Sequence, residues 1–275
     1  MWISHLKWPL NVDEICHALA VQIRLNTHIN TNNVLSIWTV LRCFQGLSAI
    51  EDGSSTIGLI HFTLKKYLFL HVDLFDKPHS KMAETCLAYL NFRGIKDLSA
   101  RPSRDLLGTP FLRYSSPHRG IHMRMKPSDH SRSLELELLH QFYDHISTGS
   151  LWRSTVDQCF HFHRQFSALY CISYFGIAEV AIDLINMRTW DMNRRDSMDH
   201  APLVWATGHR HGEVAKLLSQ RKHIQAGASN MVHGRTALSW VAQSGHEELL
   251  GYFLQGSEWS AEDRLGLARP GPSLV

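Results

Sequence analysis

The sequence predicts a mainly α-helical protein that carries one small β-hairpin and ends in a stack of paired helices. Amphipathic segments with recognisable helix caps recur along the chain, and only one stretch has the pattern of two short strands around a turn. From about residue 166, similar segments repeat at intervals of 34 and 35 residues. The length of 275 residues exceeds that of a usual single domain, so we expect more than one compact unit.

The first helix with a clear start lies between Pro9 and Val21. Asn11 is suited to cap this helix, because a short polar side chain there accepts a hydrogen bond from a backbone N–H of the first turn. Glu14 follows three residues later and completes the pattern of a capping box. A polar stretch with four asparagines between positions 26 and 33 comes next, and we expect a loop there.

A second helix is expected over 34–44, with Leu35, Trp38, Leu41 and Cys43 towards the core and Gly46 after its end. Residues 47–50 and 56–62 flank a polar turn and predict a β-hairpin, and 63–70 returns to helical spacing. Two helices followed by a two-stranded ribbon have the outline of a winged-helix domain. We therefore assign residues 1–76 to a winged-helix-like unit.

Residues 77–165 are expected to form a helical linker region. One helix is predicted over 80–92, a second is predicted to begin at Thr109-Pro110, and a third covers 134–146. The stretch 99–107 contains Pro102 and is predicted to be a loop. The predicted inward face of the first of these helices consists of Met82, Cys86, Leu87, Tyr89 and Leu90.

Three segments that align without gaps begin at 167, 201 and 236. Their spacing is close to the period of about 33 residues of ankyrin repeats, and they resemble the ankyrin T-P-L-H-x-A pattern. Thr236 is suited to cap a first helix, Pro202 suits a first helical position, and Gly176 and Gly245 suit a left-handed residue between two helices. Arg210 occupies the glycine position of the middle copy, at a cost of roughly 1 kcal/mol. We expect about three ankyrin repeats in 166–275, the last of them truncated.

Several collinear segments, at 9–20, 59–68, 86–90, 109–114, 174–176 and 190–196, together carry a resemblance that covers most of the chain. They resemble the portion of fungal-type NACHT-ankyrin proteins that follows the nucleotide-binding domain. The resemblance implies a winged-helix-like region, a helical linker and ankyrin repeats, as the arm and sensor of a signalling switch. That family hydrolyses nucleotide through a P-loop, but no G-x-x-x-x-G-K-[ST] occurs here, so we do not expect this activity.

Composition and cysteine usage narrow the classes of protein further. The net charge of +3 does not by itself indicate a nucleic-acid or membrane partner. The five cysteines are scattered and form no C-x-x-C, which argues against a disulfide framework and a cysteine-based zinc site. We find neither a secretory signal nor a segment apolar enough to span a bilayer. We expect a cytoplasmic protein, with the nucleus as the alternative compartment.

No catalytic constellation stands out, so we expect no enzyme, no cofactor and no metal. G-x-S-x-G, H-E-x-x-H and dinucleotide fingerprints are absent from the sequence. His161 and His163 beside Cys159, with Cys171 later, match the spacing of no standard zinc finger. His61, at the junction of a predicted strand and helix, is expected to be a core or capping histidine.

Six residues in the repeats are candidate contacts for a protein partner: Trp205, Trp240, Arg194, Arg195, His209 and His211. The two tryptophans occupy equivalent positions. They either pack within the stack or lie on its concave face, where aromatic side chains often dominate binding. The two arginines and the two histidines lie in expected turns, where they either remain solvated or meet an acidic partner.

The function expected from these observations is that of a non-catalytic protein–protein interaction or scaffold module. One alternative is nucleic-acid binding through the winged-helix-like unit, although its second predicted helix carries only Arg42 as a basic residue. The other alternative is a regulatory subunit that acts in trans on a nucleotide-binding partner. We expect protein partners, and neither a membrane, a nucleic acid nor a small-molecule substrate.

Overall fold

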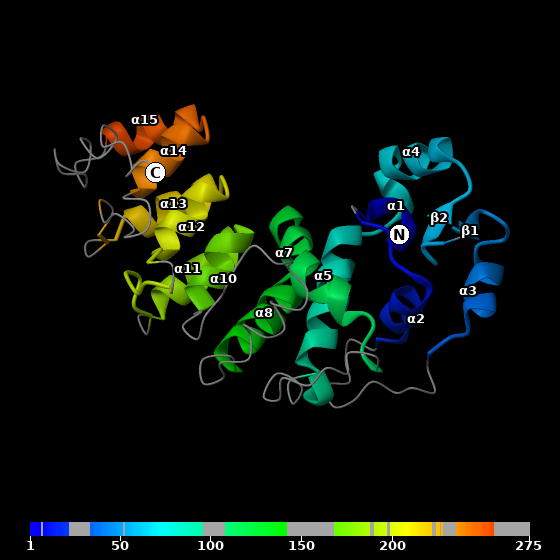
Figure 1. The fold of residues 1–275 in the computed structure, drawn as a ribbon. Coiled ribbons are helices and arrows are strands. Elements are labelled where there is room, and N and C mark those ends of the chain that lie inside the picture. Colours follow the sequence, from blue (N-terminus) through cyan, green and yellow to red (C-terminus); the bar gives the residue numbers. More distant parts are fainter. Residues whose placement is uncertain are drawn as a thin grey trace, which may run out of the picture. The chain divides into compact units, whose positions relative to one another are not determined.

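The computed structural model is mainly helical, and its described part contains a two-stranded antiparallel sheet (Figure 1). The structure describes residues 1–6, 8–21, 34–51, 53–95, 108–141, 168–187, 190–196, 199–221, 224–225, 227 and 235–255. These residues divide into two compact units, one that runs to Leu138 and one that begins at Leu139. The predicted division into 1–76, 77–165 and 166–275 stays a prediction.

The first unit contains short N-terminal helices, the small sheet and three longer helices. Its elements are α1 (Trp2–His5), α2 (Val12–Ala20), α3 (Ile37–Cys43), β1 (Ser48–Ile50), β2 (Ile57–Leu59), α4 (Phe62–Leu70), the 3-10 helix η2 (Val72–Leu74), α5 (Pro78–Asn91), α7 (Leu112–Met125) and most of α8 (Asp129–Gln141).

Helix α2 begins as its sequence predicts. The backbone N–H of Glu14 donates to Asn11 Oδ1 over 2.8 Å, and the N–H of Asn11 donates to Glu14 Oε2 over 2.8 Å. The capping box is therefore complete, and it satisfies two backbone donors that the helix itself leaves unpaired. An isolated β-bridge joins Asn11 to Thr56, so the start of α2 is also attached to the hairpin.

Helix α3 is shorter than predicted, and its predicted inward face is wrong. The helix starts at Ile37, with Ser36 as its N-cap, and Val40 is its buried residue. Trp38 is 71% exposed, and Leu35 and Cys43 are also exposed. Apolar spacing identifies a stripe on a helix, but the neighbouring elements decide which stripe is covered. A helix of seven residues has little surface with which to fix that choice.

The predicted hairpin is confirmed, with shorter strands. β1 and β2 pair antiparallel, with Ser48 opposite Leu59, Ala49 opposite Gly58 and Ile50 opposite Ile57. His61 follows β2 and is the N-cap of α4, because its ring nitrogen Nδ1 accepts from the backbone N–H of Thr63 over 3.2 Å. The predicted capping role of His61 is thus confirmed.

Helices α5 and α7 form the core of the first unit. All five residues of the predicted inward face of α5 are buried, which confirms that prediction. Phe111, which precedes α7, packs nearly perpendicular to two other rings, those of Trp2 at a centroid distance of 5.6 Å and of Tyr89 at 5.2 Å. The sequence predicts that α7 begins at Thr109-Pro110, but the helix begins at Leu112. Pro110 lies instead in a turn, in which the N–H of Leu112 donates to the carbonyl of Thr109.

The second unit contains three pairs of helices that repeat along the chain (Figure 1). α12 begins 34 residues after α10, and α14 begins 35 residues after α12. α10 packs against α12, α12 against α14, and α11 against α13. The pairs are α10 (Ala168–Phe175) with α11 (Ala178–Asn186), α12 (Pro202–Gly208) with α13 (Gly212–Ser219), and α14 (Ala237–Gln243) with α15 (Glu247–Gln255).

Three apolar positions are equally buried in all three pairs. Each first helix buries a leucine two residues after the segment start, and each second helix buries two apolar residues four apart that face the core. None of these side chains is more than 2% exposed: Leu169, Leu203 and Leu238; Val180, Val214 and Leu249; Leu184, Leu218 and Phe253. The helices are too short to be stable alone, so this mutual burial holds the pairs together.

The turn between the two helices is also the same in each pair. The left-handed residue is Gly176 with φ +73°, Arg210 with φ +62° and Gly245 with φ +65°. The next residue donates its N–H to the carbonyl five positions earlier, as in a Schellman turn. These bonds are Ile177 to Ile172 at 3.3 Å, His211 to Ala206 at 2.8 Å, and His246 to Val241 at 3.3 Å. Arg210 therefore keeps the left-handed geometry that the sequence assigns to its position.

We expect alanine at position 176 to destabilise the second unit by about 2 kcal/mol, and alanine at position 245 by about 1 kcal/mol. At both positions the alanine would have to adopt the left-handed φ of the glycine, which is strained for a residue with a Cβ. A Cβ at 176 would also lie 2.4 Å from Nδ1 of His211, whereas a Cβ at 245 meets nothing within 4 Å. Arg210→Gly should stabilise by about 1 kcal/mol because it removes the same strain. Urea unfolding of the three variants measures this order, and an equal cost at 176 and 245 would contradict it.

None of the helices in the described part of the chain combines the length and apolar character needed to cross a membrane. Several predicted features lie outside the described residues. They are the loops at 26–33 and 99–107, the residues beyond 141 of the predicted helix 134–146, and Cys159, His161 and His163.

Candidate interaction surface

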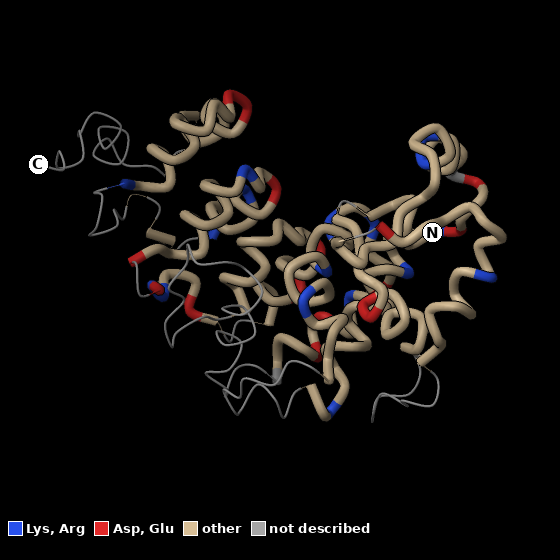
Figure 2. Tube along the Cα trace, turned by 45° about the vertical axis from the view of Figure 1, so that its right-hand side comes forward, with Lys and Arg blue, Asp and Glu red and all other residues tan. Residues whose placement is uncertain are grey.

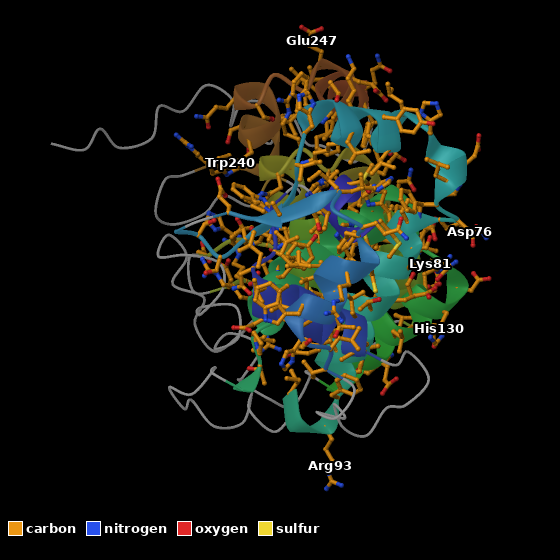
Figure 3. The ribbon with its side chains drawn as sticks, turned by 90° about the vertical axis from the view of Figure 1, so that its right-hand side faces the viewer. Asp76, Lys81, Arg93, His130, Trp240 and Glu247 are labelled. Atoms are coloured by element: carbon orange, nitrogen blue, oxygen red, sulfur yellow. The ribbon has the colours of Figure 1, made fainter. Side chains whose placement is uncertain are left out.

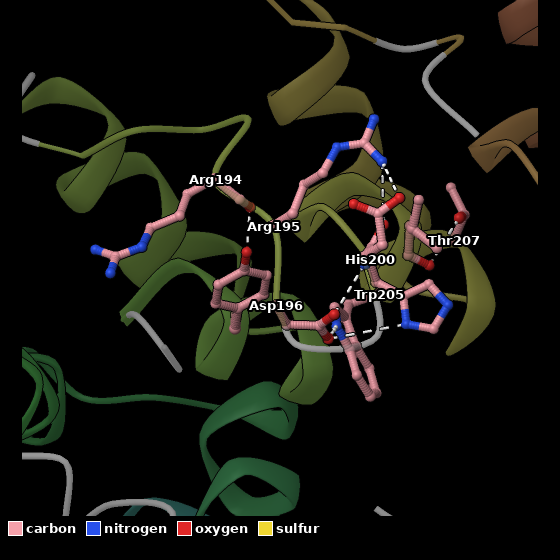
Figure 4. A network of polar contacts seen from close by, with 9 residues as sticks. Arg194, Arg195, Asp196, His200, Trp205 and Thr207 are labelled. Atoms are coloured by element: carbon pink, nitrogen blue, oxygen red, sulfur yellow. Dashed lines mark hydrogen bonds and ion pairs between the residues drawn. The ribbon is translucent and has the colours of Figure 1, made fainter. Parts of the chain in front are cut away.

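Asp196 is the centre of a polar network in the loop that leads into α12 (Figure 4). Its Oδ1 accepts the backbone N–H of His200 over 2.8 Å, and its Oδ2 accepts the indole N–H of Trp205 over 2.8 Å. The imidazole Nδ1 of His200 lies 3.8 Å from the same Oδ2. The carboxylate thus ties the loop to the first helix of the second pair.

The hydrogen bonds to Asp196 also set its charge. Burial alone raises the pKa of this carboxyl, but the hydrogen bonds from the side chain and backbone of His200 and from Trp205 outweigh burial, so the pKa is lowered. Asp196 is therefore ionised at neutral pH. An ionised acceptor makes a stronger hydrogen bond than a neutral one, which fixes the orientation of the Trp205 indole.

Trp205 is 7% exposed and belongs to an aromatic cluster with Tyr174 and His209. The rings of Trp205 and His209 are parallel, with centroids 5.4 Å apart, and the ring of Tyr174 meets His209 edge-on at 4.5 Å. Burial lowers the pKa of His209, so the ring is neutral and stacks without the desolvation cost of a charge. Trp205 consequently presents little surface to solvent and positions its neighbours.

Arg194 and Arg195 lie in the same loop, in different environments. Arg194 is exposed, and its backbone carbonyl accepts the hydroxyl of Tyr170 (Figure 4). Arg195 is half-buried, and its Nη1 donates to Oδ2 of Asp199 over 2.6 Å. Asp199 has a left-handed backbone with φ +60°, which aspartate tolerates better than most residues. Arg194 therefore keeps its guanidinium available at the surface, while Arg195 braces the loop.

His211 connects the first two helix pairs. Its Nε2 lies 2.8 Å from the backbone oxygen of Tyr174, and its ring lies where a side chain at Gly176 would be. His246 occupies the equivalent position of the third pair, and its Nε2 lies 3.2 Å from the backbone oxygen of Arg210. The predicted contact residue His211 is thus part of a repeated contact between successive pairs.

Trp240 is the counterpart of Trp205 in the third pair, but its surroundings differ. The Arg235 guanidinium lies over its ring at 4.9 Å, and its edge approaches Gly208 of the second pair. The side chain is half-buried, and the indole nitrogen finds no hydrogen-bond partner among the described residues. Trp240 therefore retains exposed aromatic surface with an arginine beside it.

The structure brings most of the six predicted contact residues into one region of the second unit. The loop residues Arg194 and Arg195 adjoin Trp205 through Asp196, and His209 stacks on Trp205. Sequence reasoning missed Asp196 and Tyr174 as the residues that hold this region together. In the sequence, Asp196 is marked only as an acidic residue shortly before a helix, and Tyr174 only as an aromatic residue just before a turn. Neither pattern specifies which residue the side chain contacts. Trp240 joins this region because its ring approaches Gly208, next to His209. We name the region formed by Arg194 to Asp196, Trp205, His209, Trp240 and Arg235 the loop–helix face.

The described side chains contain no group of three or more His, Cys, Asp or Glu residues arranged to hold a metal ion. Cys171, one member of the zinc cluster considered from the sequence, is buried in α10. The other members lie outside the described residues.

No family model matches the chain, and no curated protein matches it either.

We expect Trp205→Phe to lower the free energy of unfolding of the second unit by about 1.5 kcal/mol more than Trp240→Phe does. Both changes remove an indole N–H and keep an aromatic ring. Only the N–H of Trp205 donates to a charged acceptor, whereas that of Trp240 has no partner in the described part of the chain. Urea unfolding of both variants measures the difference. Equal costs would show that the Asp196 bond contributes nothing net.

Proposed function

We propose that this chain is a non-catalytic protein-binding module, in which an ankyrin-type stack of helix pairs presents the loop–helix face to a protein partner. The observation that carries the proposal is the repetition of one structural unit. Three helix pairs share their spacing of 34 and 35 residues, a left-handed residue at the same turn and the same buried positions. Stacks of short repeats create extended surfaces, and such surfaces commonly bind other proteins.

The loop–helix face has the chemistry of a protein interface. It combines an aromatic ring with exposed surface at Trp240, an arginine above that ring, and the exposed guanidinium of Arg194. Tryptophan and arginine are the side chains most enriched in the energetic centres of protein interfaces. The network around Asp196 holds the loop in one conformation before binding, which lowers the entropy lost on association.

The first unit supports a further part of the proposal, a winged-helix-like arrangement. α2 and α3 precede the β1–β2 hairpin, and the start of α2 is bridged to that hairpin at Thr56. The function that such units often have, nucleic-acid binding, is less well supported here. α3 carries Arg42 as its one basic residue, and Figure 2 shows Lys and Arg interspersed with Asp and Glu along the described trace. A duplex-DNA shift that weakens steeply with salt would reverse this preference.

Site-specific crosslinking tests the proposed function. A photoreactive amino acid is placed at position 194 or 240 of the full chain, and the chain is exposed to extract of the source cells. The same protein should be crosslinked from both positions, because both belong to the loop–helix face. Capture of a nucleotide-binding protein would specify the partner class as that of a regulatory subunit acting in trans.

The matched control carries the crosslinker at position 247. Glu247 is exposed at the start of α15, on a second helix, and points away from the ribbon in Figure 3, which also labels Trp240. A substituent there should not disturb the stack or reach a partner on the loop–helix face. If position 247 yields the same adducts as positions 194 and 240, or if none of the three yields a discrete adduct, the proposed function is wrong.

A further inference from the structure

The first unit contains a pocket between α1, α4, α5 and α7, with a volume of about 240 Å³. Its apolar walls are Leu6, Phe69, Ile121 and Met125. Phe69 and Met125 are exposed and form its rim, whereas Tyr114 and His122, which also line it, are buried. The pocket is therefore a recess that is open at one side and closed by the core of the unit at the other.

Four histidines from three helices meet at this pocket: His5 from α1, His79 from α5, and His118 and His122 from α7. The rings of His79 and His122 stack with centroids 5.2 Å apart, and the rings of His5 and His79 lie edge to face at 5.9 Å. Such a gathering of imidazoles around a recess is not needed to build a core, because apolar side chains would fill the space without the need for polar partners.

Both ring nitrogens of His122 form hydrogen bonds within the protein. Its Nε2 lies 2.8 Å from the hydroxyl of Tyr114, and its Nδ1 lies 2.9 Å from Nδ1 of His79. A neutral imidazole has one donor and one acceptor nitrogen. The direction of the hydrogen bond between Tyr114 and His122 therefore determines the direction of the bond between His122 and His79. If the Tyr114 hydroxyl donates to His122, then His122 donates to His79, and the proton of His79 resides on Nε2.

The remaining ring nitrogens are available to a ligand. The Nε2 atoms of His5, His79 and His118 make no hydrogen bond to any described residue, because the bonds of these rings all use Nδ1. Lys65, on α4 at the pocket wall, makes neither a hydrogen bond nor an ion pair within the described part of the chain. His118 Nδ1 donates to the carbonyl of Tyr114, and His5 Nδ1 donates to Ser4 Oγ, whose own proton goes to the carbonyl of Met1. The Nε2 atoms of these two neutral rings are therefore acceptors. The lining thus offers one imidazole donor, the Nε2–H of His79, and one fixed positive charge, Lys65.

Among the described residues, the lining contains no aspartate and no glutamate. A positive ammonium and an imidazole donor without an acidic counterpart favour a negatively charged group. The apolar walls favour a ligand whose body is aromatic or aliphatic, since a small inorganic anion would leave them in contact with water. A cavity of about 150 Å³ holds benzene, so about 240 Å³ accommodates a ligand of roughly ten non-hydrogen atoms.

We propose that this pocket binds a small organic acid, whose carboxylate contacts Lys65 and accepts the Nε2–H of His79 and whose apolar body packs against Leu6, Phe69, Ile121 and Met125. The proposal is independent of the loop–helix face, which lies in the other unit. It gives the first unit a ligand-sensing role that the sequence does not predict, because the contributing residues lie between positions 4 and 125.

Titration of the full chain with benzoate tests the proposal, with histidine side chains labelled with ¹⁵N and observed by NMR. Benzoate should shift the resonances of His79 and His118 saturably, with a Kd of about 1 mM or tighter for a ligand of this size. Benzamide, which has the same shape without the charge, and inorganic phosphate, which has the charge without the apolar body, should each bind at least about tenfold more weakly.

Two lysines on α4 provide a matched pair of variants. Lys65→Gln should weaken benzoate binding about five- to tenfold, whereas Lys66→Gln, which changes the neighbouring exposed lysine outside the pocket, should leave it unchanged. Both positions are exposed, so neither variant endangers the fold. The proposal is overturned if benzoate causes no saturable shift, if benzamide binds as tightly, or if the two lysine variants behave alike.

Discussion

Replacement of Arg119 by methionine should lower the free energy of unfolding of the first unit by about 3–5 kcal/mol. Arg119 of α7 and Glu135 of α8 form an ion pair in the core, where their side chains are 3% and 0% exposed. The Nε of Arg119 lies 3.2 Å from Oε2 of Glu135, and its Nη1 donates to the carbonyl of Ser116. Methionine fills a similar volume but leaves the buried carboxylate without its cation.

The double variant Arg119→Met/Glu135→Leu is the control for this expectation. Burial raises the pKa of Glu135 even against the opposing charge of Arg119, which shows how strongly the site disfavours an isolated charge. Because the double variant removes both charges, it should recover most of the stability lost in the single variant. Urea unfolding measures both changes in free energy, and hydrogen exchange of the backbone amides in α5, α7 and α8 assigns them to the first unit. A double variant as unstable as the single one would mean that packing, not charge, explains the loss.

Local sequence patterns correctly predicted those features that depend on neighbouring residues in the chain. The capping box at Asn11 and Glu14, the cap at His61 and the left-handed residue at Arg210 each depend on residues within a few positions, and all are present. The repeat spacing predicted three equivalent helix pairs, because copies of one unit must bury equivalent positions. The predicted inward face of α3 was wrong because the covering elements, which lie elsewhere in the chain, determine it.

The side-chain clusters were beyond sequence reasoning for a related reason. The equivalence of Trp205 and Trp240 was visible in the repeat, but the bond from Trp205 to Asp196 depends on how a loop folds over a helix. His118 and His122 are four residues apart on α7, but no spacing rule joins them to His5 and His79. Three helices must first pack before these rings become neighbours.

The histidine cluster should make the first unit sensitive to acid. Burial first, and then the neighbouring histidines His79, His118 and His5, lower the pKa of His122 to about 3. In an unfolded chain the pKa of histidine is about 6.5, so below that pH the unfolded state binds a proton that the folded state excludes. The stabilisation is complete above pH 6.5 and is lost as the pH falls towards 3. The loss from this residue should reach about 3 kcal/mol at pH 4.

The variant His122→Gln isolates this contribution, because glutamine stays neutral and still accepts from Tyr114 and donates to His79. Its unfolding free energy should fall about 3 kcal/mol less between pH 7 and pH 4 than that of the unaltered chain. His130→Gln, which changes an exposed histidine on α8 labelled in Figure 3, should retain the full dependence. Urea midpoints at both pH values, with hydrogen exchange to assign the transition to α5 and α7, measure the difference. If His122→Gln loses stability as steeply as the unaltered chain, the His122 imidazole is not the group that acid protonates. The effect then comes from His5, His79 and His118, whose pKa values burial also lowers.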